Sequence, residues 1–200
     1  MIMNILAFVD MHGNDKAWKE IKIKSKSADI IVCGGDISIF ENNLGLLLLE
    51  LNQLGKQVLI IPGNHENSED LDVFTKGLKN ILNIHKRSFV KEDYLFLGYG
   101  GAGFSMVDSE FDKLQKQFDR ELKNWNDGKV ILVTHAPPYK TRIDQIMDDP
   151  CGNKSIKNFI LKAKPDLVIS GHLHENAGKE DSVGKTRIIN PGPYGKIVIL

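Results

Sequence analysis

The sequence has no excess of charge of either sign, because its 200 residues include 26 acidic and 26 basic side chains. Proteins that bind nucleic acid without sequence preference usually carry a basic excess, so this balance argues against that class. Cysteine is also scarce. Cys33 and Cys151 lie far apart in no CxxC or CxxH pattern, which argues against a zinc ribbon or a disulfide framework.

Long apolar runs are missing as well. The most apolar stretch, Leu44 to Leu54, is interrupted by polar residues and is too short to span a bilayer. A strand is predicted almost at the first residue, which leaves no room for a signal peptide. We therefore expect a soluble, cytoplasmic protein without a membrane partner. No linker or internal repeat divides the chain, so we expect a single domain over residues 1–200.

Short apolar runs alternate with helical patterns along the chain. Five runs are nearly continuous, at residues 2–9, 29–33, 58–61, 129–133 and 166–169. Such runs suit strands that are buried on both faces of a largely parallel sheet, and the alternation with helices predicts an α/β fold. Helices are expected at residues 15–24, around 44–51, and at 68–78, 109–126 and 154–162. Shorter strands are expected at 80–85, 89–97, 186–189 and 196–200, with a hairpin near 92–93.

Side chains that can bind metal follow the five runs. The run 58–61 ends in Pro62-Gly63-Asn64-His65-Glu66, where proline and glycine stop the strand. The five strand ends together carry Asp10, His12, Asp36, Asn64, His65, His135, His172 and His174. Ligands of open α/β sheets bind beyond the carboxyl ends of the strands. Five of the six histidines lie at these ends, which isolated surface histidines do not account for, so we predict one shared site.

The chemistry of this set points to metal ions. Carboxylates, imidazoles and one amide oxygen, without a thiolate, suit a borderline or hard first-row dication. The donors are too many for one tetrahedral ion, whereas two ions that share a bridging carboxylate would use them all. Two ions about 3.5–4 Å apart can clamp the attacking and leaving oxygens of a phosphoryl transfer, and a shared water would have its pKa lowered to about 7.

The order of the motifs DxH, GGD, GNHE, THAPP and GHLH resembles the calcineurin-like metallophosphoesterase superfamily, and within it the small single-domain prokaryotic phosphodiesterase-like branch. The motifs span residues 10 to 174. The resemblance implies a four-layer α/β/β/α sandwich. It also implies a binuclear phosphoesterase that attacks with a metal-bridging hydroxide.

The resemblance further implies a role for each site residue. One ion would be held by Asp10, His12, Asp36 and His174. The other would be held by Asp36, Asn64, His135 and His172, with Asp36 bridging. His65 would be a catalytic residue and not a ligand, contacting the phosphate and protonating or polarising the leaving oxygen, with Asn64 also near the phosphate. Two divalent ions are expected, manganese first, with iron, zinc, nickel or cobalt as alternatives.

One motif departs from the superfamily pattern. Its protein Ser/Thr phosphatases continue the second motif as GDxxDRG, whereas here Asp36 is followed by Ile37-Ser38-Ile39-Phe40. The arginine that grips phosphate is missing, which argues against a protein phosphatase. We expect hydrolysis of phosphodiester bonds in small or nucleotide substrates, with phosphomonoesters as a further substrate class.

Two other functions are compatible with the sequence. A catalytically silent metal-binding scaffold would be free to lose His65 or a ligand, and none is missing. A metal-dependent nuclease is disfavoured by the neutral charge and by the lack of a capping domain, so we do not expect a nucleic-acid partner. Lys140 and Arg142 would either steer a negatively charged substrate or be solvated surface residues. The sequence does not predict the oligomeric state.

Overall fold

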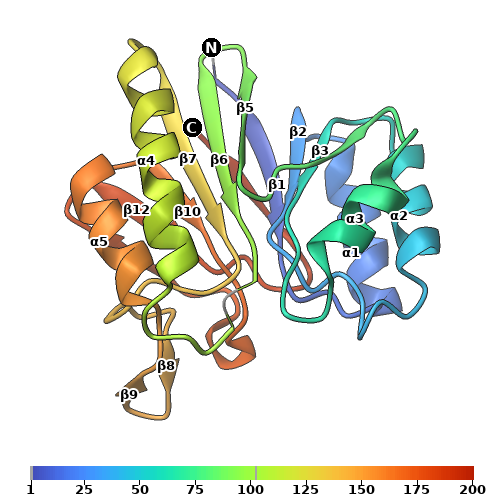
Figure 1. Ribbon diagram of the computed structural model, residues 1–200. Helices are drawn as coiled ribbons and strands as arrows, with labels where there is room; N and C mark the ends of the chain where they lie inside the picture. The colour runs from blue at the N-terminus through green and yellow to red at the C-terminus, as the bar shows by residue number, and fades with distance from the viewer. Residues whose placement is uncertain (1, 102) are drawn as a thin grey trace.

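Two β-sheets lie face to face between two layers of helices in the computed structural model, which describes residues 2–101 and 103–200 (Figure 1). The expected α/β fold and the four-layer α/β/β/α sandwich are confirmed. Within residues 2–101 and 103–200, none of the helices has the length and apolar character that a membrane span requires.

The first sheet contains mostly strands from the first half of the chain. In spatial order it consists of β13 (Lys196–Ile199), β1 (Asn4–Phe8), β2 (Ile30–Cys33), β3 (Val58–Ile60) and β4 (Ile81–Asn83). Strands β1 to β4 are parallel, and β13 pairs antiparallel with β1 at one edge. The outer face is covered by α1 (Asp15–Ser25), α2 (Leu44–Gln53) and α3 (Ser68–Thr75).

The second sheet contains strands that lie between residues 87 and 189. Its order is β11 (Glu180–Val183), β12 (Thr186–Ile189), β10 (Leu167–Ile169), β7 (Lys129–Thr134), β6 (Tyr94–Tyr99) and β5 (Arg87–Lys91). The four central strands are parallel and both edges are antiparallel. Its outer face is covered by α4 (Ser109–Asn124) and α5 (Lys154–Ala163). A small hairpin of β8 (Gln145–Ile146) and β9 (Asp149–Pro150) projects from the loop before α5 (Figure 1).

Alternating side chains of each strand fill two different cores. In β1, Ile5 and Ala7 pack between the sheets, whereas Leu6 and Phe8 face the helices. In the same way Ile131 of β7 belongs to the core between the sheets, and Leu132 faces α4 and α5. Because side chains of a strand alternate between its faces, two buried faces make every position apolar.

The apolar runs alone do not indicate that the strands divide between two sheets, a division that the family resemblance implied. A continuous apolar run shows that both faces of a strand are buried, but it does not show whether a helix or a second sheet covers each face. Some smaller elements differ from the prediction. Asn14 caps α1 and Asn67 caps α3, but α3 ends at Thr75, three residues before the predicted end. The hairpin expected near 92–93 is confirmed, with β5 and β6 on either side of the turn. Strand β11 and the β8–β9 hairpin were not predicted, because they are short and polar.

Candidate metal centre

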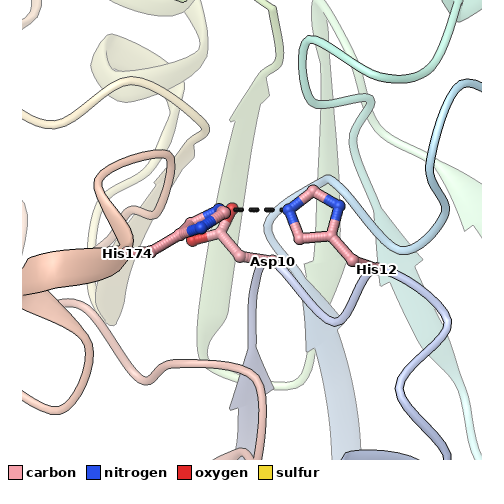
Figure 2. Close-up of side chains that lie close together, drawn as sticks. All are labelled: Asp10, His12 and His174. Atoms are coloured by element: carbon pink, nitrogen blue, oxygen red, sulfur yellow. Dashed lines mark hydrogen bonds between the residues drawn. The ribbon is translucent and has the colours of Figure 1, made fainter.

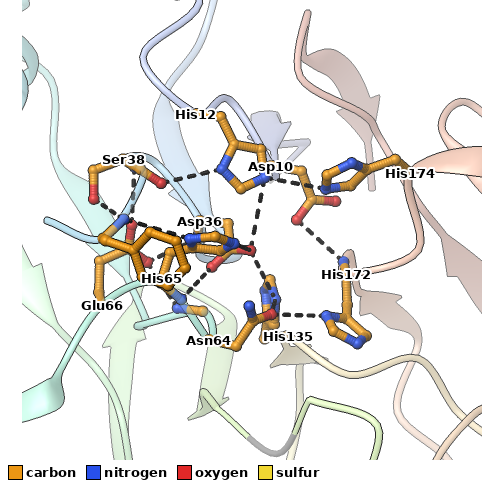
Figure 3. Close-up of polar contacts among 12 residues, drawn as sticks. Asp10, His12, Asp36, Ser38, Asn64, His65, Glu66, His135, His172 and His174 are labelled. Atoms are coloured by element: carbon orange, nitrogen blue, oxygen red, sulfur yellow. Dashed lines mark hydrogen bonds and ion pairs between the residues drawn. The ribbon is translucent and has the colours of Figure 1, made fainter. Parts of the chain in front are cut away.

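The predicted site residues come together where the carboxyl ends of strands from the two sheets meet. In the first sheet, residues 10 and 12 follow β1, residue 36 follows β2, and residues 64 and 65 follow β3. In the second sheet, residue 135 follows β7, and residues 172 and 174 follow β10. Figure 3 shows all eight in one cluster: Asp10, His12, Asp36, Asn64, His65, His135, His172 and His174. The prediction of one shared site at the strand ends agrees with this placement, although the ends belong to two sheets.

The backbone at this site has an uncommon conformation. Four of the eight residues have positive φ angles: Asp10 at 54°, His12 at 48°, Asp36 at 52° and His172 at 72°. Such values are uncommon for residues other than glycine and cluster at functional sites. Gly63 shows how tightly the loops pack, because a Cβ atom there would overlap the Asp36 carboxylate. The loop after β3 therefore lies directly against the loop after β2.

One group of donor atoms consists of Asp10, His12 and His174, whose ligand atoms lie within 4.8 Å of one another (Figure 2). The Nδ1 atom of His12 lies 3.1 Å from the carbonyl oxygen of Ser38, which can only accept a hydrogen bond. In a neutral His12 ring the proton is therefore on Nδ1, and Nε2 carries the lone pair. That Nε2 atom lies 3.0 Å from Nε2 of His174, so it faces the middle of the group.

A second group consists of Asn64, His135 and His172. The Oδ1 atom of Asn64 lies 3.1 Å from Nε2 of His135 and 2.8 Å from Nδ1 of His172. Nδ1 of His135 donates to the carbonyl oxygen of Gly34 at 3.0 Å when the ring is neutral, which leaves the lone pair on Nε2. Nε2 of His135 and Oδ1 of Asn64 are then two acceptors that face each other without a proton between them. A cation bound between them would remove this repulsion. The donor set therefore fits a divalent metal ion.

Asp36 lies between the two groups, with only 2% of its side chain exposed (Figure 3). Its Oδ2 atom is 3.7 Å from Nε2 of His12 and 3.5 Å from Nε2 of His135. The carboxylate thus faces one histidine from each group, which is the position that a bridging ligand needs.

His65 approaches the same carboxylate from a third direction, with Nε2 3.9 Å from Oδ2 of Asp36. Its ligand atom also lies within 4.8 Å of those of His12 and Asp36, so distance alone does not separate a ligand from a proton donor. The backbone N–H of Phe40 donates to Nδ1 of His65 at 3.4 Å. In the neutral ring the proton is then on Nε2, the atom that faces the site.

Burial and charge shift the pKa values of these groups in opposite directions. Burial opposes the charged forms of Asp36 and His135, but their mutual hydrogen bond and attraction outweigh it, which lowers the pKa of Asp36 and raises that of His135. Burial raises the pKa of Asp10. Burial and the charge of His135 lower the pKa of His172 to about 4. His172 is thus held neutral, the form in which an imidazole binds metal.

Glu66 is a functional residue to which the sequence analysis gave no role. Its buried carboxylate accepts the backbone N–H groups of Asp36, Ser38 and Gly63, each at 2.9 Å, and the Ser38 hydroxyl at 2.8 Å. It therefore fixes the loop after β2 against the loop after β3. Because these partners are mainly backbone N–H groups, which every residue carries, no side-chain pattern in the sequence signals this role.

A pocket of about 280 Å³ opens onto the cluster. Besides five of the predicted site residues it is lined by Phe104, Ile146, Leu173 and Glu175. Lys140 and Arg142 do not line it. Both are exposed, and the backbone N–H of Arg142 donates to Asp181, which favours the interpretation of solvated surface residues.

The family model for calcineurin-like phosphoesterases matches residues 3–176. The chain belongs to the calcineurin-like phosphoesterase family. This family is metal-dependent, in agreement with the donor groups described above, and the resemblance seen in the motifs is confirmed.

Relatives with similar sequences or structures support this membership. The uncharacterized protein MJ1162 of Methanocaldococcus jannaschii is 30% identical, over 98% of this chain and 91% of that protein. A probable glycerophosphodiester phosphodiesterase, GpdQ, of Arcobacter nitrofigilis is 24% identical, and the match covers 73% of this chain and 56% of that relative. Among solved structures, TT1561 of Thermus thermophilus matches 96% of this chain and 90% of its own with a TM-score of 0.77 and 17% identity. A dimetal phosphatase of Danio rerio matches 93% of this chain and 86% of its own with a TM-score of 0.60 and 12% identity.

Proposed function

We propose that the protein is a binuclear metal-dependent phosphoesterase that hydrolyses phosphodiester bonds of small substrates, nucleotides among them. The observation that carries the proposal is the position of Asp36, whose Oδ2 atom faces His12 of one donor group and His135 of the other at 3.7 and 3.5 Å. A carboxylate between two sets of donors supports two ions with a shared ligand.

The pocket favours a diester over a monoester. Within the part of the chain that the structure describes, no lysine or arginine lines it. A phosphomonoester carries about −1.5 to −2 charges at pH 7, whereas a diester carries one. A site whose positive charge comes from two ions alone is better matched to the single charge. The similarity to a relative named as a probable phosphodiesterase supports the same substrate class.

The roles of the residues follow from their donors. Asp10, His12 and His174 would hold one ion, Asn64, His135 and His172 the other, and Asp36 both. When bound, the two ions would supply Lewis acidity and hydroxide at neutral pH. Asn64 would also orient the phosphate.

His65 would act as the general acid. Its Nε2 proton faces the site, and the backbone N–H of Phe40 holds its ring through Nδ1. With the ring neutral, Nε2–H would donate a hydrogen bond to the departing oxygen, and a ring protonated on both nitrogens would transfer the Nε2 proton to it and return to the neutral form. Glu66 would keep Asp36 and His65 in register, because it binds the backbone of both loops.

A metal and substrate panel tests the proposal. Metal-free protein would be reconstituted separately with Mn²⁺, Fe²⁺, Zn²⁺, Ni²⁺, Co²⁺ and Mg²⁺, with manganese expected to give the highest rate. Each sample would be assayed with bis(p-nitrophenyl) phosphate, p-nitrophenyl phosphate and a phosphopeptide. We expect the diester to be cleaved at least as fast as the monoester. A strong monoester preference with phosphopeptide hydrolysis would overturn the diester assignment, and no hydrolysis with any ion would favour a silent scaffold.

A further inference from the structure

Phe104 is an exposed aromatic side chain at the edge of the candidate metal centre. Two thirds of it, 66%, is open to solvent, yet its ring centroid lies 4.3 Å from that of His172 in an edge-to-face contact. It lines the 280 Å³ pocket together with Ile146 and Leu173. This volume is close to the lower end of the roughly 300–1,000 Å³ that small-molecule sites occupy. Phe104 therefore offers an apolar surface directly beside the reacting groups.

Hydrogen bonds fix the backbone directly after Phe104. The carbonyl oxygen of Ser105 accepts from Nδ2 of the buried Asn153 at 2.7 Å, and that of Met106 accepts from the backbone N–H of Lys154 at 2.7 Å. Anchoring of the two residues that follow Phe104 lowers the entropy that a bound ligand would have to remove.

We propose that Phe104 determines specificity by stacking against the nucleobase of a nucleoside phosphodiester, on the ester group that stays attached to phosphorus. The inference rests on the proposed phosphodiesterase function and deepens it.

The surroundings of Phe104 favour a nucleobase over an acyl chain. The same pocket is lined by Glu175, which the proposed ion sites do not use. A base presents a flat π-face to the phenyl ring and N–H donors to a carboxylate. A hydrocarbon chain would instead cover this carboxylate without offering hydrogen bonds, which is unfavourable.

The position of Phe104 favours the retained ester group over the leaving group. His65, the proposed proton donor, and His172 lie on opposite sides of Asn64 (Figure 3). His65 contacts Phe40, whereas Phe104 contacts His172. A leaving oxygen directed at His65 therefore places the other ester group toward Phe104.

Two substrates with the same leaving group test the inference. Thymidine 5′-(p-nitrophenyl phosphate) and methyl p-nitrophenyl phosphate both release p-nitrophenol and differ only in the retained group. We expect the wild-type protein to have the higher kcat/KM for the thymidine ester. Phe104→Ala should lower that value by roughly 5- to 150-fold, the range typical of one base–aromatic stack. The value for the methyl ester should change by less than about twofold.

Matched variants separate stacking from bulk. Phe104→Trp should retain the preference for the thymidine ester, whereas Phe104→Leu, which keeps apolar volume without a π-face, should lose most of it. Phe74→Ala on α3 is the control, because Phe74 is also exposed, at 46%, and does not line the pocket. Calorimetric binding of thymidine 5′-monophosphate to the metal-loaded protein gives a readout without turnover and should weaken in Phe104→Ala by a similar factor.

The outcomes distinguish this inference from the proposed function. Hydrolysis of both esters with no preference for the thymidine ester would overturn the stacking site alone. An equal loss of kcat/KM for both esters in Phe104→Ala would indicate that the ring contacts the shared leaving group. It would overturn the assignment of Phe104 to the retained ester group. Octyl p-nitrophenyl phosphate tests the alternative of an acyl chain. If its kcat/KM equalled that of the thymidine ester and fell by the same factor in Phe104→Ala, the assignment of a nucleobase would be overturned. Binding of thymidine 5′-monophosphate that depends on Phe104, without hydrolysis of either ester, would support the site and overturn the phosphoesterase.

Discussion

The Oδ1 atom of Asp36 accepts a hydrogen bond from the backbone N–H of His65 at 2.9 Å. This bond ties the loop after β2 to the loop after β3 and leaves Oδ2 of the same carboxylate facing the histidines. One side chain therefore orders the loop that carries the proposed general acid and also lies between the two proposed ion sites.

Asp36→Asn should lower the occupancy of both metal sites, because the amide replaces one carboxylate oxygen that would contact both ions. Asp10→Asn is the matched comparison and should mainly weaken one site, since Asp10 belongs to one donor group. Elemental analysis of the purified variants after dialysis measures both effects. Two tightly bound ions per chain in Asp36→Asn would contradict the bridging role.

His65→Asn should keep the fold and both ions but lower kcat by about 100- to 10,000-fold, the range typical of general acid catalysis. The loss should shrink for leaving groups such as p-nitrophenol, which need little protonation. Metal content and kcat would be measured together across leaving groups of different pKa. Lower metal occupancy with full rescue by excess Mn²⁺ would instead identify His65 as a ligand.

Glu66→Gln should destabilise the protein by roughly 1–3 kcal/mol, because the new amide group places N–H donors against backbone N–H donors in a buried site. Metal affinity should fall as well, since Asp36 loses the partner of its backbone. Urea unfolding and metal titration measure the two effects. Glu69→Gln, at an exposed position of α3, should leave both unchanged, and an unchanged metal affinity in Glu66→Gln would limit its role to stability.

His85, outside the candidate centre, should make stability depend on pH. Burial and the charge of Lys86 lower its pKa to about 4, from 6.5 in its ordinary state, and its Nδ1 atom accepts the backbone N–H of Gly100 at 2.9 Å. Between these two pKa values the unfolded chain binds more protons than the folded one, so the stabilisation is complete above about pH 6.5 and declines toward about pH 4.

The measurement is the free energy of unfolding at about pH 7.5 and about pH 5, with and without His85→Gln. Wild-type protein should lose on the order of 1 kcal/mol more than the variant between these values, because solvent around the partly exposed ring reduces the full effect of the shift. The comparison subtracts the titration of the other histidines. Equal losses in the two proteins would show that His85 is not responsible.

Much of the fold could be predicted from the sequence because strand burial and helix caps are local signals. Asn14 caps α1 directly before the predicted helix start at residue 15, and the apolar runs form the central strands. The division into two sheets could not be derived from the runs themselves, because burial of both faces has the same pattern whichever layer covers them. That division followed only from the resemblance of the motifs to a family.

The candidate site was predictable where the donors follow apolar runs. Residues that act through the backbone were not, since Glu66 binds N–H groups that every residue carries, and no side-chain pattern announces them. Phe104 was also missed, because a single phenylalanine in a glycine-rich segment has no periodicity, and its contact with His172 depends on how two distant loops meet.

The placement of the donors on two sheets has a mechanical consequence. Apart from β13, the first sheet is built from residues 4–83 and the second from residues 87–189, and each sheet supplies ligands. Bound ions would therefore cross-link the two sheets, as a disulfide does in many secreted proteins, whereas Cys33 and Cys151 are free thiols. Each ion at 100 times its dissociation constant would add about 2.7 kcal/mol to the free energy of unfolding. The melting temperature should then respond to chelators and not to reductants.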